Sequence, residues 1–317
     1  MPGLPPRRAP WPTLALSFVL PLLLPFLAAC APTMPVQCDL VRIAEMPLQS
    51  ANRLLTVPVG INGQWARMLV DTGAERSLLS EAAVKRLGLA RDARFVSTTG
   101  GVGGAARSAD VKIDSLVLGN VRFPVERMTV NRLAPSLPVD GLLGADILLA
   151  FDLDIDVPGH KLTLYRVRHC PTADPPWPDK AVPIAGVTAF KDRMMLAFEL
   201  NGVAGKALLD TGAQTTAIGR SFALRLGLTD EAMSMDRAVD IAGVGAGKMK
   251  ARLHWFRSLR IGPVAVQGLM LPVLPADLGF GDGLIGQDFL LNRRVWMSFP
   301  TRRLFISQHD HERLAPK

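Results

Sequence analysis

Short apolar runs separated by turn residues recur along the chain. Two such runs flank Asn62-Gly63 between Val57 and Val70, and two more flank Asn201-Gly202 between Leu196 and Leu209. An Asn-Gly pair between apolar runs is typical of a tight β-hairpin. Each hairpin precedes a short helix-like stretch ending in Leu-Gly-Leu. The pattern therefore predicts an all-β fold with many short strands and a short helix in each half.

The two hairpins belong to a longer internal repeat. Val57–Leu89 and Leu196–Leu228 share one plan, in which the second strand-like run leads into Asp-Thr-Gly-Ala and then into the helix-like stretch. Self-similarity of this kind indicates a duplicated structural unit. The proline-rich segment Cys170–Lys180 separates the copies, and its prolines predict a linker.

Each copy also contains a glycine-rich loop and, after it, an Asp-Gly-hydrophobic-hydrophobic-Gly-x-Asp motif. The motif reads DGLLGAD at Asp140–Asp146 and DGLIGQD at Asp282–Asp288. Three elements thus recur in the same order, which excludes coincidence as the origin of either Asp-Thr-Gly. The loop glycines are Gly100, Gly101, Gly103, Gly243 and Gly245.

Composition narrows the range of partners. Aromatic residues make up 6% of the chain, and its 28 Gly and 25 Pro favour strands and turns over a helix bundle. The net charge of +8 comes from scattered Lys and Arg, which predicts a basic surface and no nucleic-acid partner. No Cys-x-x-Cys or His-Glu-x-x-His motif occurs, so we expect neither a metal site nor an organic cofactor.

The N-terminus has the pattern of an export signal. Arg7 and Arg8 precede an apolar stretch at 11–29, which closes on Leu-Ala-Ala-Cys30. This ending resembles the lipobox of bacterial lipoproteins and implies lipidation at Cys30. An uncleaved membrane anchor remains the alternative, because the stretch is nearly long enough to span a bilayer. Both interpretations predict a protein anchored in the bacterial cell envelope and facing the periplasm.

Two further cysteines, Cys38 and Cys170, bracket the first copy of the repeat. An exported compartment permits them to form a disulfide. Two separate thiols remain the alternative, since a sequence does not fix connectivity.

The Asp-Thr-Gly triplets provide candidate chemistry. Asp71 and Asp210 each end an apolar strand, and Gly73 and Gly212 permit a tight turn behind them. Two carboxyl groups a few ångströms apart cannot both ionise readily, so they share a proton. One can then activate a water while the other protonates a peptide carbonyl.

These motifs resemble the retropepsin-like aspartic proteases, specifically bacterial exported members with two lobes fused in one chain. The resemblance implies two β-barrel lobes related by a pseudo-twofold axis, with Asp71 and Asp210 holding the nucleophilic water. It implies that Thr72 and Thr211 link the two loops beneath the carboxyls. The segments Leu142–Gly144 and Leu284–Gly286 would pass behind those loops, and the glycine-rich loops would be flaps over the substrate.

The expected organisation of the chain follows from these observations. It comprises a lipoprotein signal peptide (1–30), a tether (31–52), lobe 1 (53–168), a linker (169–184), lobe 2 (185–308) and a tail (309–317). Because the linker is short and both lobes are complete, we expect them to pair within one monomer.

One departure from pepsin-like relatives concerns pH. Ala74 and Ala213 follow the triplets where pepsin-like enzymes carry a hydroxyl residue. Loss of that hydrogen bond is expected to make the carboxyls less acidic and to move activity toward weakly acidic or neutral pH.

The remaining charged residues receive structural interpretations. Asp140, Asp146, Asp282 and Asp288 are expected to cap helices or bond turns rather than bind metal. Asp152, Asp154 and Asp156 alternate with apolar residues, which predicts a half-exposed strand rather than a calcium loop. A strand edge is expected for Arg293, Arg294 and Trp296.

The sequence therefore predicts an aspartic endopeptidase acting on exported or envelope polypeptides. The alternative is an inactive, peptide-binding envelope lipoprotein of the same fold. The presence of both aspartates favours the enzyme.

Overall fold

The computed structural model describes residues 39–102, 104–168, 174–178, 180–191, 193–245 and 247–307. The chain divides into the units Met1–Val36 and Gln37–Lys317, and all described residues belong to the second. Several expectations lie outside the described residues: the signal peptide, the 309–317 tail, Cys30, Cys38, Gly103 and Cys170.

The first lobe contains β1 to β13. Its elements are β1 (Asp39–Pro47), β2 (Gln49–Ala51), β3 (Leu54–Ile61), β4 (Gln64–Val70), β5 (Leu78–Ser80), α1 (Glu81–Arg86), β6 (Arg91–Gly101), β7 (Gly104–Lys112), β8 (Leu116–Leu118), β9 (Val121–Phe123), β10 (Arg127–Asn131), β11 (Gly141–Leu143), α2 (Ala145–Leu148), β12 (Asp152–Asp156) and β13 (Lys161–Arg168).

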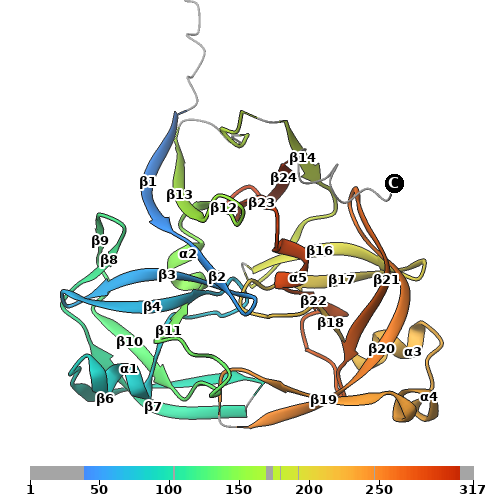
Figure 1. Cartoon of the computed structure of the whole chain (residues 1–317). Coiled ribbons are helices and arrows are strands. Elements are labelled where there is room, and N and C mark those ends of the chain that lie inside the picture. Colours follow the sequence, from blue (N-terminus) through green and yellow to red (C-terminus); the bar gives the residue numbers. More distant parts are fainter. Residues whose placement is uncertain are drawn as a thin grey trace, which may run out of the picture. The chain divides into compact units, whose positions relative to one another are not determined.

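The second lobe contains β14 to β24. Its elements are β14 (Ala181–Ile184), β15 (Thr188–Phe190), β16 (Arg193–Leu200), β17 (Val203–Leu209), β18 (Ala217–Ile218), α3 (Arg220–Arg225), α4 (Asp230–Met235), β19 (Arg237–Ala242), β20 (Lys248–Ile261), β21 (Val264–Val273), β22 (Gly283–Ile285), α5 (Gln287–Leu290), β23 (Arg294–Ser298) and β24 (Arg303–Ser307). Both lobes are built from strands with short helices, which confirms the all-β prediction (Figure 1).

Each lobe has its own sheet, of order β6-β7-β10-β5-β11-β4-β3-β8-β9 in the first and β15-β16-β17-β22-β18-β21-β20-β19 in the second. The predicted hairpins are β3–β4 and β16–β17. Asn62, Gly63, Asn201 and Gly202 all have positive φ, as a two-residue turn of this type requires. The turn chemistry of the repeat is therefore confirmed in both copies.

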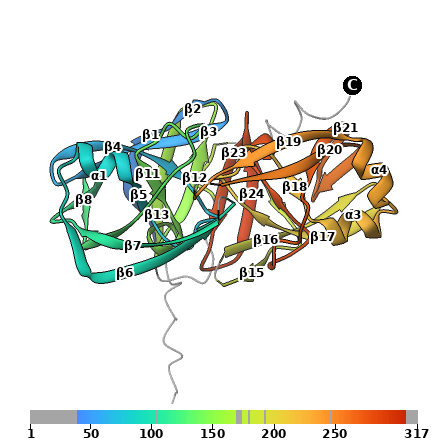
Figure 2. The ribbon, with the colours of Figure 1, turned by 90° about the horizontal axis from the view of Figure 1, so that it is seen from below.

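A third sheet, of order β1-β13-β12-β23-β24-β14, joins the lobes (Figure 2). Three strands come from each lobe, and β12 pairs with β23 in antiparallel register, with Asp154 opposite Trp296. Since β23 lies inside this sheet, the expected strand edge at Arg294 and Trp296 is wrong. The strand predicted at Asp152–Asp156 is confirmed but not half-exposed, because Asp152 and Asp154 are buried.

The inter-lobe sheet also corrects the expected boundaries. Strands β1 and β2 lie within the segment expected to be a tether, and β1 pairs with β13 along its length. Strand β14 lies within the expected linker and pairs with β24. These strands complete sheets whose apolar side chains must be buried. The sequence of the strands themselves does not show this need.

The main hydrophobic core includes buried side chains from both lobes, such as Leu55, Leu153, Phe222 and Met297. Among the described residues, no helix is long and apolar enough to cross a membrane.

Candidate active site

The two Asp-Thr-Gly loops meet between the lobes. β4 delivers Asp71, whose backbone N–H donates to Leu143 O at 3.0 Å on β11. β17 delivers Asp210, whose N–H donates to Ile285 O at 2.9 Å on β22. In each lobe the strand behind the loop runs parallel to the delivering strand. These are the segments expected to pass behind the active-site loops.

Four buried hydrogen bonds tie the loops together through Thr72 and Thr211. Thr72 N donates to Thr211 Oγ1 at 2.9 Å, and Thr211 N donates to Thr72 Oγ1 at 3.1 Å. Each hydroxyl then donates to the opposite lobe, Thr72 Oγ1 to Leu209 O at 2.8 Å and Thr211 Oγ1 to Val70 O at 2.6 Å. This reciprocal network, which we call the threonine bridge, fixes one aspartate loop against the other.

Gly73 and Gly212 allow the loops to approach closely. A Cβ placed on Gly73 would lie 2.5 Å from Asp210 Cγ, and one on Gly212 would lie 2.3 Å from Asp71 Cγ. Any side chain at either position would push the opposite carboxyl away. Each glycine thus permits the carboxyl of the other lobe to lie against its backbone.

Hydrogen bonds orient the two carboxyls in the same way. Asp71 Oδ1 accepts from Gly73 N at 3.0 Å and Ala74 N at 2.8 Å. Asp210 Oδ1 accepts from Gly212 N at 2.9 Å and Ala213 N at 3.2 Å. In both lobes the backbone thus holds the carboxyl by its Oδ1 atom.

Burial raises the pKa of both carboxyls. For Asp71 the nearby charge of Asp210 raises the pKa further, to well above the usual range. For Asp210 burial is opposed by the two backbone N–H groups, by a hydrogen bond from Asp71 and by the positive charge of Arg193, so its pKa is raised less. Because both pKa values are raised and the two carboxyls interact, the pair titrates as one coupled unit.

A serine or threonine beyond each triplet locks the loop to the following helix. Asp146 Oδ1 accepts from Ser77 N at 2.8 Å and from Ser77 Oγ at 2.7 Å. Asp288 Oδ1 accepts from Thr216 N at 3.0 Å and from Thr216 Oγ1 at 2.6 Å. The expected helix cap is wrong, since Gly144 and Gly286 occupy the N-cap positions. Both aspartates instead support the loops that carry the dyad.

Asp140 and Asp282 also serve a structural role shared by both lobes. Asp140 Oδ2 accepts from Arg67 N at 2.8 Å and pairs with Arg86 at 2.9 Å. Asp282 accepts from Lys206 N at 2.9 Å and pairs with Arg225 at 2.7 Å. These bonds cross between distant segments, so the expectation of local turn bonds is wrong. No cluster of His, Cys, Asp and Glu suited to a metal ion occurs in the described part of the chain.

Arg193 breaks the symmetry of the site. It lies on β16 and is 8% exposed, yet its Nη1 donates to Gly73 O of the other lobe at 3.0 Å. Its Nη2 lies 3.5 Å from Glu75 Oε1, and the rings of Phe190 and Phe280 lie 5.6 and 5.7 Å from its guanidinium carbon. The repeat aligns Arg193 with Leu54 of the first lobe. One lobe therefore supplies a cation beside the dyad and the other does not.

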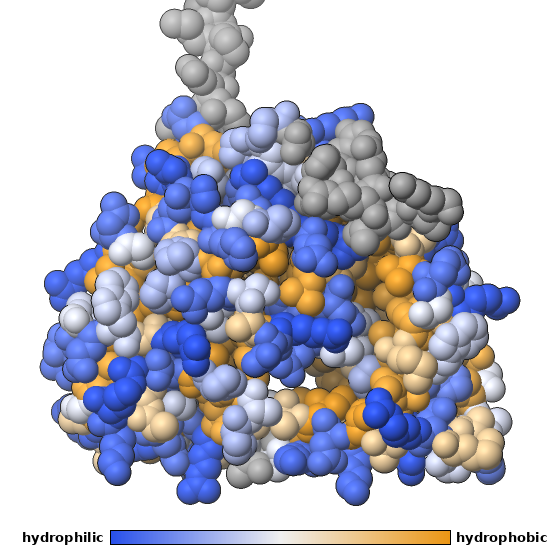
Figure 3. All heavy atoms as spheres, in the orientation of Figure 1, coloured by the Kyte–Doolittle hydropathy of each residue, from blue (hydrophilic) through white to orange (hydrophobic). Residues whose placement is uncertain are grey.

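The glycine-rich loops form the tips of two β-hairpins, flap 1 (β6–β7) and flap 2 (β19–β20). A Cβ on Gly101 would lie 2.7 Å from Val244 Cβ, so the tips touch. Flap 2 is also bonded to the first lobe, since Ala134 N donates to Gly243 O at 3.1 Å and Gly245 N donates to Arg132 O at 3.0 Å. An opening lies between the lobes on the side of these flaps (Figure 3).

Sequence reasoning missed Ser77, Asp146, Thr216, Asp288 and Arg193 as parts of the site. A signal for the first four was present, because Ser77 and Thr216 occupy matching positions of the repeat and so do the two aspartates. For Arg193 no such signal existed, because the repeat offers no second copy.

Comparison with known proteins identifies the family of the chain. The family profile described as "Aspartyl protease" matches residues 57–147 and 196–289, one segment in each lobe and together more than half of the chain. The UBA domain-containing protein Mud1 of Schizosaccharomyces pombe is 34% identical over 114 residues, which cover 35% of this chain and 33% of that protein.

A structural comparison returns the crystal structure of an aspartic proteinase from Irpex lacteus, with 15% identity, a TM-score of 0.48 and coverage of 86% of this chain and 97% of that one. The profile matches both lobes over the segments that carry the triplets and the strands behind them. The chain belongs to the aspartyl protease family.

Proposed function

We propose that this protein is an aspartic endopeptidase that hydrolyses peptide bonds of exported or envelope polypeptides. The observation that carries the proposal is the pair of buried carboxyls, Asp71 and Asp210, which are hydrogen-bonded to each other and whose pKa values are both raised by burial. A shared proton between two acids is the arrangement that acid–base hydrolysis of an amide needs. Two carboxyls that share one proton are the established catalytic pair of aspartic proteases in general.

In the proposed reaction, Asp210 accepts a proton from a water molecule as the water oxygen forms a bond to the peptide carbonyl carbon. Asp71 donates its proton to the carbonyl oxygen at the same time. The resulting neutral tetrahedral intermediate breaks its C–N bond as the Asp210 proton passes to the nitrogen, which leaves as an amine, while a hydroxyl of the intermediate returns its proton to Asp71. A carboxylic acid forms on the other fragment, the dyad returns to its starting proton count, and no metal or organic cofactor is needed.

The surroundings of the dyad suit an extended polypeptide. The opening between the lobes lies beside two flaps whose tips present Val102 and Val244, and Val244 packs on a cluster that includes Leu54, Leu69 and Leu142. These side chains favour apolar residues near the cleaved bond. The flaps would exclude water from the reacting atoms once the peptide is bound.

The raised pKa values support activity at weakly acidic to neutral pH. Each carboxyl accepts two backbone N–H bonds, and Ala74 and Ala213 add no hydroxyl donor. A pH profile of kcat/KM that peaks below about pH 3.5 would contradict this part of the proposal.

We also propose that the chain is exported and lipid-anchored through Cys30, facing the periplasm, and that Cys38 and Cys170 form a disulfide. The support is the signal-like N-terminus described above. Mass spectrometry of the mature protein would test both parts. A diacylglyceryl group on Cys30 and a mass two hydrogens lower for the peptide pair supports them, whereas an intact residue 1 or two free thiols contradicts the respective part.

The test of the activity uses residues 37–317, which contain the whole compact unit. This protein is incubated with a diverse peptide mixture from pH 4 to 7, beside Asp71→Asn, Asp210→Asn and the exposed control Asp114→Asn. Either active-site substitution should lower kcat/KM by roughly 10²–10⁴-fold or more, because one proton-transfer partner is lost. The control should retain full activity.

Gel filtration of the active protein decides whether one chain forms the site. A monomer that loses activity on either single substitution supports one intramolecular dyad. A folded wild-type monomer that cleaves nothing would overturn the proposal and favour the peptide-binding alternative.

A further inference from the structure

An exposed apolar pair lies on the long β20–β21 hairpin of the second lobe. Trp255 and Met270 are directly opposite each other across the two strands, and they are 57% and 47% exposed. Phe256, the next residue on β20, is fully buried. The strand thus points one side chain into the core and leaves a tryptophan in solvent.

The first lobe has a different kind of residue at the corresponding position. Ser-Leu-x-hydrophobic-Gly occurs at Ser115–Gly119 and at Ser258–Gly262, and this match places Lys112 at the position of Trp255. Lys112 pairs with Arg127 as Trp255 pairs with Met270. The Arg127 guanidinium carbon lies 3.7 Å from the centre of the Phe95 ring on β6. One lobe therefore has a charged and partly covered pair, whereas the other has an apolar and open one.

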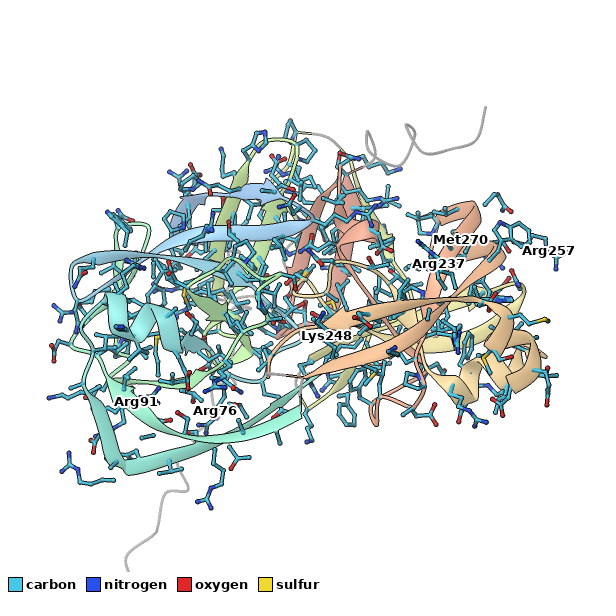
Figure 4. The ribbon with its side chains drawn as sticks, turned by 60° about the horizontal axis from the view of Figure 1, so that its bottom comes forward. Arg76, Arg91, Arg237, Lys248, Arg257 and Met270 are labelled. Carbon is cyan, nitrogen blue, oxygen red and sulfur yellow. The ribbon has the colours of Figure 1, made fainter. Side chains whose placement is uncertain are left out.

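Two arginines flank the apolar pair. Arg237, the first residue of β19, lies opposite Leu253 on β20, and Leu253 and Arg257 share the strand face of Trp255. Figure 4 shows Arg237 and Arg257 beside Met270 at the same end of the second lobe. Neither guanidinium has a carboxylate partner within the described ranges, and the nearby Asp236 is paired with His254 at 2.7 Å. We call Trp255, Met270, Arg237 and Arg257 the Trp255 face.

We propose that the Trp255 face docks on an anionic lipid surface. Tryptophan favours the boundary between water and hydrocarbon, where its ring is apolar and its N–H stays hydrated. Unpaired arginines beside it complement anionic headgroups. A second copy of this chain would bring the same arginines against each other across a twofold contact, and that repulsion disfavours self-association as the role of this face.

The test measures binding of residues 37–317 to vesicles, so that the apolar N-terminus contributes nothing. A Trp65→Phe background leaves Trp255 as the one tryptophan with a largely exposed side chain among the described residues. Vesicles of phosphatidylcholine with 30 mol% phosphatidylglycerol should shift the emission of Trp255 to the blue, whereas pure phosphatidylcholine should not. Co-sedimentation gives the partition coefficient, and circular dichroism checks that each variant is folded.

Matched variants distinguish lipid binding through the Trp255 face from binding through the overall positive charge of the protein. Trp255→Gln with Met270→Gln should lower the partition coefficient at least tenfold, while Trp65→Gln, at a tryptophan that is 64% exposed, should change it less than twofold. Arg237→Gln with Arg257→Gln should lower it roughly fivefold for each arginine removed. Arg107→Gln with Lys112→Gln in the first lobe should have a smaller effect.

Three results would overturn the proposal. The first is the absence of binding to the anionic vesicles, and the second is binding that survives Trp255→Gln with Met270→Gln in a folded protein. The third is a monomer–dimer equilibrium in sedimentation that the same double substitution abolishes, which would assign the face to a second copy. None of these readouts depends on peptidase activity, so failure here and failure of the proposed enzymatic function are distinguishable.

Discussion

The two lobes repeat the scaffold of the candidate site almost bond for bond, but they differ in what surrounds it. In both, the aspartate accepts two backbone N–H bonds, a threonine reaches across, and a serine or threonine is locked to an aspartate of the following helix. Among the matched positions that differ are Leu54 against Arg193, Ala145 against Gln287 and Asp152 against Arg294.

The difference separates two physical requirements. Bringing two carboxyls together needs reciprocal contacts, and a duplicated loop supplies each contact twice. Biasing one carboxyl toward its charged form needs a contribution from one side only, and the positive charge of Arg193 is one such contribution that lowers the pKa of Asp210 against the effect of burial. Gln287 adds a second single-sided contact, because its buried side chain donates to Thr211 O whereas Ala145 has no amide to donate.

Breaking the threonine bridge should produce the largest effect. Thr72→Val leaves Leu209 O without a donor and Thr211 N–H without an acceptor in a buried site, and this should lower the free energy of unfolding by roughly 2–4 kcal/mol. Thr211→Val should match it within about 1 kcal/mol if the two lobes contribute equally. Urea unfolding at pH 7 measures both, with Thr72→Ser as a control that keeps the hydroxyl. A loss confined to one of the two valine variants would show that the bridge is not reciprocal.

Asp152 and Asp154, both on β12 of the inter-lobe sheet, allow a second test of how the lobes differ. Asp154 on β12 binds Arg294 on β23 through two hydrogen bonds of 3.0 and 2.7 Å, but Asp152 faces Ser298. Burial raises the pKa of Asp152 to about 6, with the Ser298 hydrogen bond and the Arg303 charge acting against the rise. The folded protein therefore holds this proton more tightly than the unfolded chain does.

Because the folded pKa of Asp152 is raised, its contribution to stability is greatest below pH 4 and is lost as the pH rises toward 6. The loss should be roughly 2–3 kcal/mol, and Asp152→Asn should remove most of it and stabilise the protein at pH 7. Denaturant unfolding between pH 4 and 7 measures the slope. Asp154→Asn is the contrast: it should destabilise at pH 7 because Arg294 loses its charged partner. A wild-type slope that persists in Asp152→Asn would exclude Asp152 as its source.

Replacing Arg193 by its counterpart tests the source of asymmetry in the dyad. Arg193→Leu removes a charge that stabilises the Asp210 carboxylate, so the pKa of Asp210 should rise and the acid limb of the kcat/KM profile should move to higher pH. At pH 5 kcat/KM should fall roughly threefold to tenfold, or about 1 kcal/mol. Arg193→Lys should restore the limb, because the charge is kept. An unchanged acid limb with reduced stability would assign Arg193 a purely structural role.

Substitutions at the flap tips should have the smallest effect, a change in KM. Val244 is bridged to Leu133 of the first lobe, whereas Val102 is 37% exposed. We expect Val244→Ser to raise KM roughly threefold by weakening closure of flap 2, and Val102→Ser to change it less than twofold. Steady-state kinetics on one cleaved peptide compare them. Equal effects would mean that the flaps act alike despite their different contacts.

The repeated part of the site was predictable from the sequence. Asp71 and Asp210, the threonines and glycines that follow them, the strands behind them and the glycine-rich tips all occur in matched pairs, and a duplicated motif needs a structure that uses both copies. The Asn-Gly turns fixed two hairpins locally, because their backbone requirement does not depend on distant residues.

The contacts and strands that have no second copy in the repeat were decided by the tertiary structure. Arg193 lies 120 residues from Gly73, and Asp154 lies 140 residues from Arg294, so neither contact is visible in a local pattern. Strands β1, β2 and β14 were expected to be tether and linker because their own sequences do not show which sheet they pair with. Backbone pairing across the lobes selects their conformation, and the burial that makes this pairing favourable exists only once both lobes are folded.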